Sequence, residues 1–155
     1  MEFQLWWTGK TSFSYLEVGI ADYIKRLSHF CKLKVIEFKG SKGIKISQQI
    51  QQFEENELLN KLSPNDFIIL LDENGKEMNS NKFAIQISQL QNSSYPRIVF
   101  IIGGAYGFTE IMKSKANLLL SFSKFTLSHQ LIRLVFMEQF YRAFTIINNL
   151  PYHNE

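Results

Sequence analysis

The sequence predicts an α/β fold in which a mostly parallel sheet of about five strands carries helices on both faces. Strand-like and helix-like patterns alternate along the chain. Two expected strands, 67–71 and 98–102, are apolar at every position, as strands covered by helices on both faces are. Such alternation favours parallel strands joined by crossover helices. The 155 residues fit one domain, 1–155, without an internal repeat or linker.

The first half of the chain predicts two strand–helix pairs. An apolar and aromatic strand is expected at 3–7. The helix after it repeats apolar residues at helical spacing from Ile20 to Leu27. A second β-type segment is expected from Cys31, with Leu33, Val35 and Phe38 in it, and the helix that follows is rich in Gln and Glu. It ends before a turn cluster at 63–65.

The second half predicts three more strands, at 67–71, 98–102 and 118–120. Ser80 is placed to cap the helix between the first two of these, and the apolar face of that helix runs to Leu90. A short helix is expected at 109–113. The last helix, expected at 128–147, carries a long apolar stripe.

Three loops at the carboxyl ends of the central strands form the candidate ligand site, because parallel α/β sheets bind ligands at this edge. The loop 72–77 offers a carboxylate for a ribose or a metal, although a polar turn with Gly75 at positive φ is the favoured alternative. The glycines of 103–107 allow close approach to a ligand, or form only a tight turn. The loop 121–129 alternates hydroxyl and apolar residues, which fits the wall of a cleft or a loop ending in a helix cap.

Composition excludes several classes of protein. With 45% hydrophobic and 20% charged residues, the chain is neither disordered nor fibrous. Cys31 is the single cysteine, so no intrachain disulfide or cysteine-cluster metal site is possible, and no metal is expected. No signal peptide or membrane span is apparent, so we expect a cytoplasmic protein without membrane contact. The segment 9–12 reads like the end of a P-loop, but Gln4 stands where that motif needs a glycine.

Basic residues concentrate in the first third of the chain. The formal net charge of +3 is too small by itself to indicate a nucleic-acid partner. Lys39, Lys42 and Lys45, however, lie together in a glycine-containing loop, and Lys10 follows the first strand. Contact with RNA phosphates is one interpretation of these lysines, and a solvated surface is the equal alternative.

Three stretches of the sequence, taken in order, resemble one protein family. They are LLDENG at 70–75, IVFIIGGAYGF at 98–108, and SFSKFTLSHQLIRLVFMEQFYRAFTIINNLPYHNE at 121–155. Together they resemble the bacterial ribosomal RNA large-subunit methyltransferase H family of the SPOUT class. The resemblance spans essentially the whole chain. Its specific part is the combination of LSHQLxR with EQxYRAxxIxxNxPYH, whereas a pair of glycines alone is weak.

The resemblance implies methyl transfer from S-adenosylmethionine to N3 of a pseudouridine in 23S ribosomal RNA, at the ribosomal subunit interface. It also implies a homodimer and a C-terminal trefoil knot, which no sequence periodicity would indicate. Because the last helix is more apolar than one sheet face requires, Phe136, Met137 and Tyr141 are expected at the dimer interface. Carried over by position, the cofactor contacts are Leu71, Gly103, Phe122, Ser123, Lys124, Phe125, Thr126 and Leu127.

The reaction requires removal of a proton, since N3 of a pseudouridine is nearly inert as a nucleophile until its proton leaves. His153 is the candidate base, because imidazole titrates near neutral pH. Tyr152 is a candidate to stack on the target base or to donate to one of its oxygens. His129 is the rival base, because it lies near the start of the last helix, whose N-terminus would lower its pKa and keep it neutral. We nevertheless expect a structural role for it. Two other functions are kept as alternatives: a module that binds RNA or a ribosomal partner without chemistry, and a different nucleotide-binding α/β enzyme.

Overall fold

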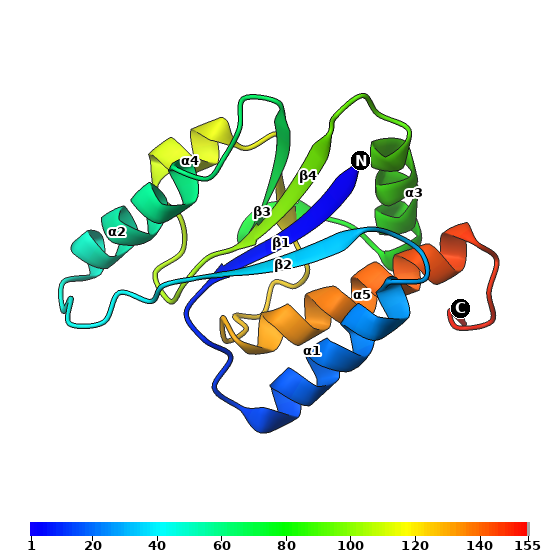
Figure 1. Ribbon diagram of the computed structural model, residues 1–155, viewed down its shortest axis with the longest axis horizontal. Helices are drawn as coiled ribbons and strands as arrows, with labels where there is room; N and C mark the ends of the chain where they lie inside the picture. The colour runs from blue at the N-terminus through cyan, green and yellow to red at the C-terminus, as the bar shows by residue number, and fades with distance from the viewer. Residues whose placement is uncertain (155) are drawn as a thin grey trace.

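The computed structural model describes residues 1–154 and contains a five-stranded sheet in which every strand pairing is parallel (Figure 1). The strand order β2-β1-β4-β3-β5 confirms the predicted α/β class. Glu155, the last residue of the predicted domain, lies outside the described residues. The strands are β1 (Glu2–Thr8), β2 (Leu33–Phe38), β3 (Asp66–Glu77), β4 (Arg97–Ile102) and β5 (Leu118–Ser121).

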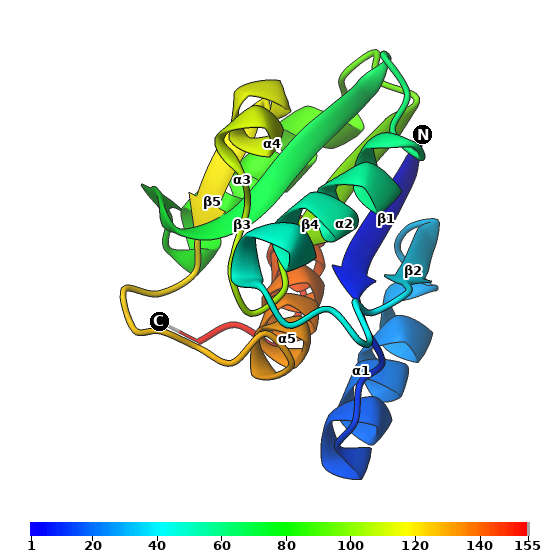
Figure 2. The ribbon, with the colours of Figure 1, turned by 90° about the vertical axis from the view of Figure 1, so that its left-hand side faces the viewer.

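Helices cover both faces of the sheet, as predicted. Helices α1, α3 and α5 pack on one face, and α2 and α4 pack on the other (Figure 1 and Figure 2). Alternate residues of one strand therefore enter different cores. In β1, for example, Leu5 and Trp7 face α5, whereas Trp6 faces the side of α2 and α4. The helices are α1 (Ser14–Leu27), α2 (Ser47–Leu59), α3 (Ser80–Gln91), α4 (Glu110–Lys115) and α5 (Leu131–Ile147).

Phenylalanines fill much of the core between α5 and the sheet. Phe136, Phe140 and Phe144 lie one turn apart on α5, and their rings contact Phe3 of β1 and Phe100 of β4. The centroid separations of these pairs range from 4.8 to 6.0 Å. Aromatic pairs in edge-to-face or tilted geometry contribute stability beyond the area they bury. Five of the fourteen phenylalanines of the chain thus hold α5 on the sheet.

The expectation that Phe136 and Met137 lie at a dimer interface is wrong. Both side chains are 0% exposed in the single chain and belong to its core. Tyr141 is half-buried and packs on Tyr23 of α1 and on Tyr152 of the tail. The apolar stripe of α5 is longer than a sheet face requires because α1 and α3 also pack against this helix.

The carboxyl ends of three neighbouring strands lie in one row. In the pairing register, Ile102 of β4 lies opposite Leu71 of β3, and Leu71 lies opposite Leu120 of β5. The three candidate loops therefore leave the sheet side by side. Strand β3 is longer than predicted, because it continues to Glu77 after a shift of register between Leu71 and Lys76.

Gly75 lies in this irregular part of β3 and serves close packing. The expectation of a positive φ at this position is wrong, since the glycines that adopt a positive φ are Gly9, Gly43 and Gly107. A Cβ atom at Gly75 would lie 2.6 Å from the carbonyl carbon of Leu119. A residue without a side chain is therefore needed here for the backbones of β3 and β5 to approach each other.

An ion pair joins two strands at the amino-terminal edge of the sheet. Nε of Arg97, at the start of β4, donates to Oδ1 of Asp66 at 2.6 Å, and its second nitrogen bonds the other carboxylate oxygen. Asp66 also accepts a hydrogen bond from the amide of Ser63 at 2.7 Å. The guanidinium carbon lies 5.5 Å from the centre of the Trp6 ring. The hydrogen bond to Asp66 raises the pKa of Arg97, so the guanidinium stays charged in the folded chain.

Candidate functional site

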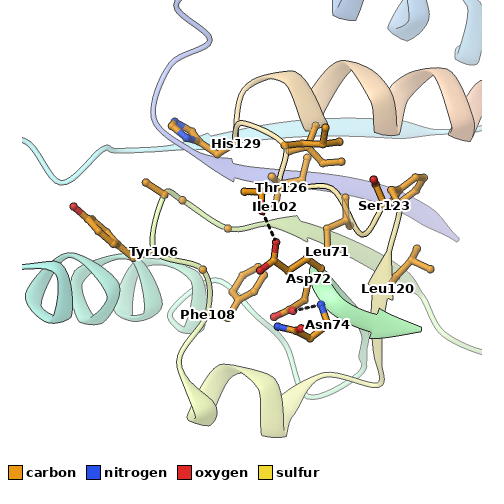
Figure 3. A pocket seen from close by; sticks show the side chains of 18 of the residues that line it. Leu71, Asp72, Asn74, Ile102, Tyr106, Phe108, Leu120, Ser123, Thr126 and His129 are labelled. Carbon is orange, nitrogen blue, oxygen red and sulfur yellow. Dashed lines mark hydrogen bonds between the residues drawn. The ribbon is translucent and has the colours of Figure 1, made fainter. Parts of the chain in front are cut away.

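The three strand-end loops enclose a pocket of about 410 Å³ at the carboxyl edge of the sheet (Figure 3). This volume lies within the usual range for small-molecule sites. The lining consists of Leu71, Ile102 and Leu120 at the strand ends, residues of 72–74, 103–108 and 122–127, and Lys113, His129 and Ile132. The structure thus brings together loops that are up to fifty residues apart in the sequence.

Two carboxylates lie in the wall formed by the first loop. Oδ1 of Asp72 accepts a hydrogen bond from the amide of Asn74 at 2.8 Å, and its Oδ2 lies 3.3 Å from Nζ of Lys113. Oε2 of Glu73 accepts a hydrogen bond from the hydroxyl of Thr126 at 3.2 Å. The carboxylates can therefore receive a positively charged group, and Glu73 also ties the first loop to the third.

The third loop is anchored at one end and exposed at the other. The ring of Phe122 packs between Phe83 of α3 and Phe136 of α5, with centroid separations of 5.4 and 5.8 Å. Phe125 is 83% exposed. Lys124 does not line the pocket, because its Nζ donates to the carbonyl oxygen of Glu73 at 3.3 Å. The predicted cofactor residues that do line it are Leu71, Gly103, Phe122, Ser123, Phe125, Thr126 and Leu127.

The second loop, residues 103–109, is called the glycine loop below. Gly107 has a φ of +69°, and its amide closes a turn by donating to the carbonyl oxygen of Gly104 at 3.1 Å. A left-handed φ of this kind favours glycine. Tyr106, at the tip of the turn, is 50% exposed and lies at the margin of the pocket (Figure 3).

His129 lies at the pocket, beside a buried arginine. Arg133 is 1% exposed, and its guanidinium donates to the carbonyl oxygen of His129 at 3.2 Å, to the hydroxyl of Thr11 at 2.9 Å and to the carbonyl oxygen of Thr8 at 2.9 Å. Its central carbon lies 4.9 Å from the ring centre of Trp7. Burial lowers the pKa of Arg133 to about 10. Burial, together with the charge of Arg133, also lowers the pKa of His129, so this imidazole is neutral near pH 7.

The cause of the neutral His129 differs from the one expected. Helix α5 begins at Leu131 rather than at 128, and the hydroxyl of Ser128 accepts a hydrogen bond from the amide of Leu131 at 3.0 Å. His129 therefore belongs to the pocket loop. Sequence reasoning did not select Arg133 as a site residue. The available signal was a charged residue inside an otherwise apolar helical stripe, which indicates a buried cation with specific partners.

The C-terminal tail packs on its own chain. The hydroxyl of Tyr152 lies 3.2 Å from that of Tyr23 and donates to Oε1 of Glu138 at 3.1 Å. The guanidinium carbon of Arg142 lies 4.8 Å from the centre of the Tyr152 ring, and its NH1 lies 3.3 Å from Nδ1 of His153. Burial, reinforced by the hydrogen bond with Tyr23, raises the pKa of Tyr152. The phenol is therefore a hydrogen-bonding group and carries no charge near neutral pH.

The tail follows the C-terminal end of α5 (Figure 1), whereas the pocket lies at the start of this helix. Ile132, near the start of α5, lines the pocket, whereas Tyr152 and His153 do not. Arg142, which holds His153, is ten residues beyond Ile132. A helix rises about 1.5 Å per residue, so this contact lies about 15 Å along α5 from the pocket. One chain therefore does not bring the predicted catalytic residues to the predicted cofactor residues.

The predicted RNA-binding lysines gather at the same edge of the sheet as the pocket. The amide of Gly9 donates to the carbonyl oxygen of Phe38 at 2.9 Å, which joins the loop after β1 to the loop after β2. Because this amide is engaged, it is not part of a phosphate-binding cradle. The lysines on these two loops are all exposed, namely Lys10, Lys39, Lys42 and Lys45.

Two kinds of feature were not found within residues 1–154. No group of three or more His, Cys, Asp and Glu side chains comes together there as a metal site. No helix in the same part of the chain combines the length and hydropathy needed to cross a membrane.

Comparison with known proteins defines the class. The family model described as predicted SPOUT methyltransferase matches residues 1–153. A solved structure, a probable methylase family protein from Haemophilus influenzae Rd KW20, shares the fold with a TM-score of 0.54 at 14% identity, covering 99% of this chain and 70% of that one. A parallel α/β sheet with a pocket at its carboxyl edge, in a chain matched over its length by this model, is a methyltransferase of the SPOUT class.

Curated relatives define the family within that class. The ribosomal RNA large subunit methyltransferase H of Cytophaga hutchinsonii is 41% identical over 99% of this chain and 100% of the relative. The enzyme of the same name from Bacteroides thetaiotaomicron is 46% identical over 95% of both chains, and that from Phocaeicola vulgatus is 45% identical over 100% of both. This chain therefore belongs to the ribosomal RNA large subunit methyltransferase H family. The resemblance inferred from its motifs is confirmed.

Proposed function

We propose that this protein transfers a methyl group from S-adenosylmethionine to N3 of a pseudouridine in 23S ribosomal RNA. Its family supports this reaction, since the relatives are named as large-subunit ribosomal RNA methyltransferases. The observation that carries the proposal to this chain is the pocket formed where Leu71, Ile102 and Leu120 end three neighbouring strands. Neither a module without chemistry nor a different nucleotide-binding enzyme is favoured by a specific observation.

The pocket fits S-adenosylmethionine in size and in charge. Its volume of about 410 Å³ suits a ligand of this kind. Leu71 and Phe122 can enclose the adenine ring, while backbone amides and carbonyls of the loops bond its edge. Asp72 and Glu73 offer carboxylates to the positive charges of the ligand. When bound, the cofactor supplies a methyl group that its sulfonium already activates.

The protein must align the reacting atoms and remove the N3 proton. The new N–C bond forms as the S–C bond breaks, and N3 must first have a free electron pair. Alignment at about 3–3.5 Å is the contribution of the pocket walls. We assign the base to His153 and base stacking or hydrogen-bond donation to Tyr152. His129 is the rival base, because its neutral imidazole already lines the pocket.

We assign His153 and Tyr152 to the pocket of a second subunit. Within one chain the contact that holds His153 lies about 15 Å along α5 from the pocket. A homodimer in which each tail completes the site of the other chain meets this requirement. It also explains why a tail at the end of α5 carries residues suited to the chemistry of a pocket at its beginning.

An exposed apolar patch offers a surface for this dimer. Phe13, Tyr15 and Val18, around the start of α1, are 51%, 66% and 71% exposed. Leu131 at the start of α5 is 39% exposed. The two helix starts are neighbours, because the amide of Ser12 donates to Oε1 of Gln130 at 2.7 Å. Covering this patch would place a partner close to the mouth of the pocket.

Ribosomal RNA, as part of the ribosome or its large subunit, is proposed to dock on the exposed lysines of the loops after β1 and β2, which flank the pocket edge. We place the enzyme in the cytoplasm with its ribosomal substrate. The trefoil knot is part of the same proposal. Its support is that the loop 122–127 bonds Glu73 of the first loop and shares a cavity with the glycine loop.

Methyl transfer from labelled S-adenosylmethionine into ribosomes from cells that lack the gene tests the function. The expected result is label at N3 of one pseudouridine, mapped by mass spectrometry of nuclease fragments. Absence of label in ribosomes, free large subunits and naked 23S RNA would contradict the proposal. His153→Ala should slow transfer by about 10²–10⁴-fold without loss of calorimetric cofactor binding. His29→Ala, at an exposed position, is the matched control.

A mixing experiment tests whether two chains share one site. His153→Ala is combined with Gly103→Val, which crowds the pocket beside Phe108. In a random mixture, half of the dimers are mixed and each has one complete site, so about a quarter of the activity should return. No recovery in a mixture shown to exchange subunits would move proton removal to a residue of the same chain, with His129→Ala as the next variant.

A further inference from the structure

Helix α2 contributes no residue to the cofactor pocket, yet it holds the glycine loop that forms one wall of it. Nε2 of Gln51 donates to the carbonyl oxygen of Tyr106 at 2.6 Å. A carboxylate oxygen of Glu55 accepts a hydrogen bond from the hydroxyl of Thr109. Between these two residues, the carboxylate of Glu54 lies against the backbone of Gly104. One face of α2 thus contacts the loop at three points, and two of these contacts are hydrogen bonds.

Of these three residues of α2, Glu54 has the least usual environment. Its side chain is buried, with 9% of the residue exposed. Within residues 1–154, no Lys, Arg or His forms an ion pair with it. Burial raises the pKa of its carboxyl, and the backbone of Gly104 opposes that rise. Because a buried carboxylate without a cation is unfavourable, an ordinary packing position would be filled better by an apolar side chain.

Gly104 is fitted to this carboxylate. A Cβ atom at Gly104 would lie 2.6 Å from each carboxylate oxygen of Glu54, so a residue without a side chain is required for the loop backbone to approach this carboxylate. Gly103, Gly107 and Phe108 lie between α2 and the cofactor pocket, since they line both that pocket and a small cavity beside α2. A shift of the loop away from α2 would therefore change the pocket wall directly.

We propose that Glu54 is a positioning residue for the cofactor: by holding the backbone of Gly104, it fixes the glycine loop in the place that binds the ligand. The inference rests on the proposed function, because the pocket it concerns is the cofactor pocket. A purely structural role and a positioning role differ in what they predict. If the role is purely structural, removal of the carboxylate lowers the stability of the protein. If the role is positioning, the same removal lowers the affinity for the cofactor, and stability is unchanged or higher.

The experiment compares Glu54→Leu, which removes the carboxylate at similar size, with Glu54→Gln, which keeps a carbonyl oxygen beside the Gly104 backbone. In the full chain, Glu54→Leu should weaken calorimetric binding of S-adenosylmethionine by about ten-fold, and should raise its KM more than it lowers kcat. Glu54→Gln should bind within about three-fold of the unaltered protein. Gln52→Ala, at an exposed position of the same helix, should change neither quantity.

Hydrogen exchange supplies a measurement that does not depend on the cofactor. The amides of 103–108 should exchange faster in Glu54→Leu than in the unaltered protein. Equal exchange together with equal affinity would overturn the inference, as would a Glu54→Gln variant as weak as Glu54→Leu. If Glu54→Leu fails to fold, Gly104→Ala disturbs the same contact from the loop side and should weaken binding likewise. An unaltered protein that binds no S-adenosylmethionine would contradict the proposed function, whereas faster exchange in Glu54→Leu would still support the positioning role.

Discussion

Two arginines lie over the two adjacent tryptophans of β1, at opposite edges of the sheet, and their partners differ. At the amino-terminal edge, Arg97 stacks on Trp6 and is paired with the carboxylate of Asp66. At the carboxyl edge, Arg133 stacks on Trp7 and donates to carbonyl and hydroxyl oxygens. In the part of the chain that the structure describes, it has no ion pair.

This difference in partners shifts the pKa values of the two arginines in opposite directions. The hydrogen bond with Asp66 raises the pKa of Arg97, whereas burial lowers that of Arg133 to about 10. Glu54, a buried carboxylate without a cation, lies at the same edge as Arg133. The carboxyl edge therefore contains a buried guanidinium and a buried carboxyl group that are not paired with each other. Proteins tolerate such groups where function requires them, so the amino edge serves stability and the carboxyl edge serves the site.

Arg97→Met should give the largest change in stability. It leaves Asp66, whose side chain is 1% exposed, as a buried carboxylate without its cation. We expect a decrease of about 3 kcal/mol in the free energy of unfolding, measured by urea titration, and normal methylation per folded molecule. The double variant with Asp66→Asn should recover part of this stability. A fall in activity per folded molecule would show that the amino edge also serves the reaction, contrary to the division of roles between the two edges.

Arg133→Met should cost less stability and more function. Three oxygens are left without their donor, which we expect to lower the free energy of unfolding by about 2 kcal/mol, while removal of a buried charge offsets part of this. Because the guanidinium joins Thr8 and Thr11 to His129 at the pocket, cofactor affinity should fall by about ten-fold. Calorimetry on the folded variant measures this affinity. Unchanged affinity would assign Arg133, like Arg97, to stability alone.

Replacing Lys39, Lys42 and Lys45 together with Ala tests the carboxyl edge as the surface that binds RNA. For every lysine that pairs with a phosphate, its removal should lower the slope of log affinity against log salt by about 0.7–0.9. The slope is measured by binding to ribosomal RNA at several salt concentrations. Lys61→Ala is the control, because this exposed lysine lies at the amino edge, before β3. Equal slopes for the triple variant and the unaltered protein would leave these lysines as a solvated surface.

Glu54→Gln should give the smallest effect, a change in how stability depends on pH. Burial raises the pKa of Glu54 in the folded chain, so folding favours the protonated carboxyl. The unaltered protein therefore loses stability as pH rises from about 4.5 through the folded pKa. Glu54→Gln lacks this pH dependence, so its stability relative to the unaltered protein should improve as pH rises above about 4.5. Urea unfolding at several pH values measures this difference, and the opposite slope would show that Glu54 is held as a favourable charge.

The strands and their ends could be predicted because a strand buried on both faces must be apolar throughout. This rule found Ile102 as the end of β4 and Leu71 as the last residue of β3 before its register shift, although β3 itself continues to Glu77. The rule that ligands bind at such ends selected the loops that line the pocket. The order of the strands could not be predicted, because apolar strands carry little information about their neighbours. Phe136 was wrongly predicted at a dimer interface for a similar reason. The apolar stripe of a helix does not indicate how many other elements pack against it.

Contacts between distant side chains set the other limit. Arg133 bonds the carbonyl oxygen of Thr8 across 125 positions of sequence, and Glu54 contacts Gly104, fifty positions away. Neither residue belongs to a motif whose spacing indicates a site. The tail shows the converse case, because its aromatic and imidazole groups suggested chemistry, yet their position about 15 Å along α5 from the pocket followed only from the fold.

The docked tail has a practical consequence for protein production. The chain begins at the amino edge of the sheet, opposite the pocket, with Met1 47% exposed just before β1. The other end is attached to α1 and α5 through Tyr23, Glu138 and Arg142. An affinity tag fused to the N-terminus should leave the enzyme unaffected. A tag fused to the C-terminus would follow directly after the tail that carries His153 and Asn154. It would obstruct the pocket of the partner subunit, in which His153 is proposed to act.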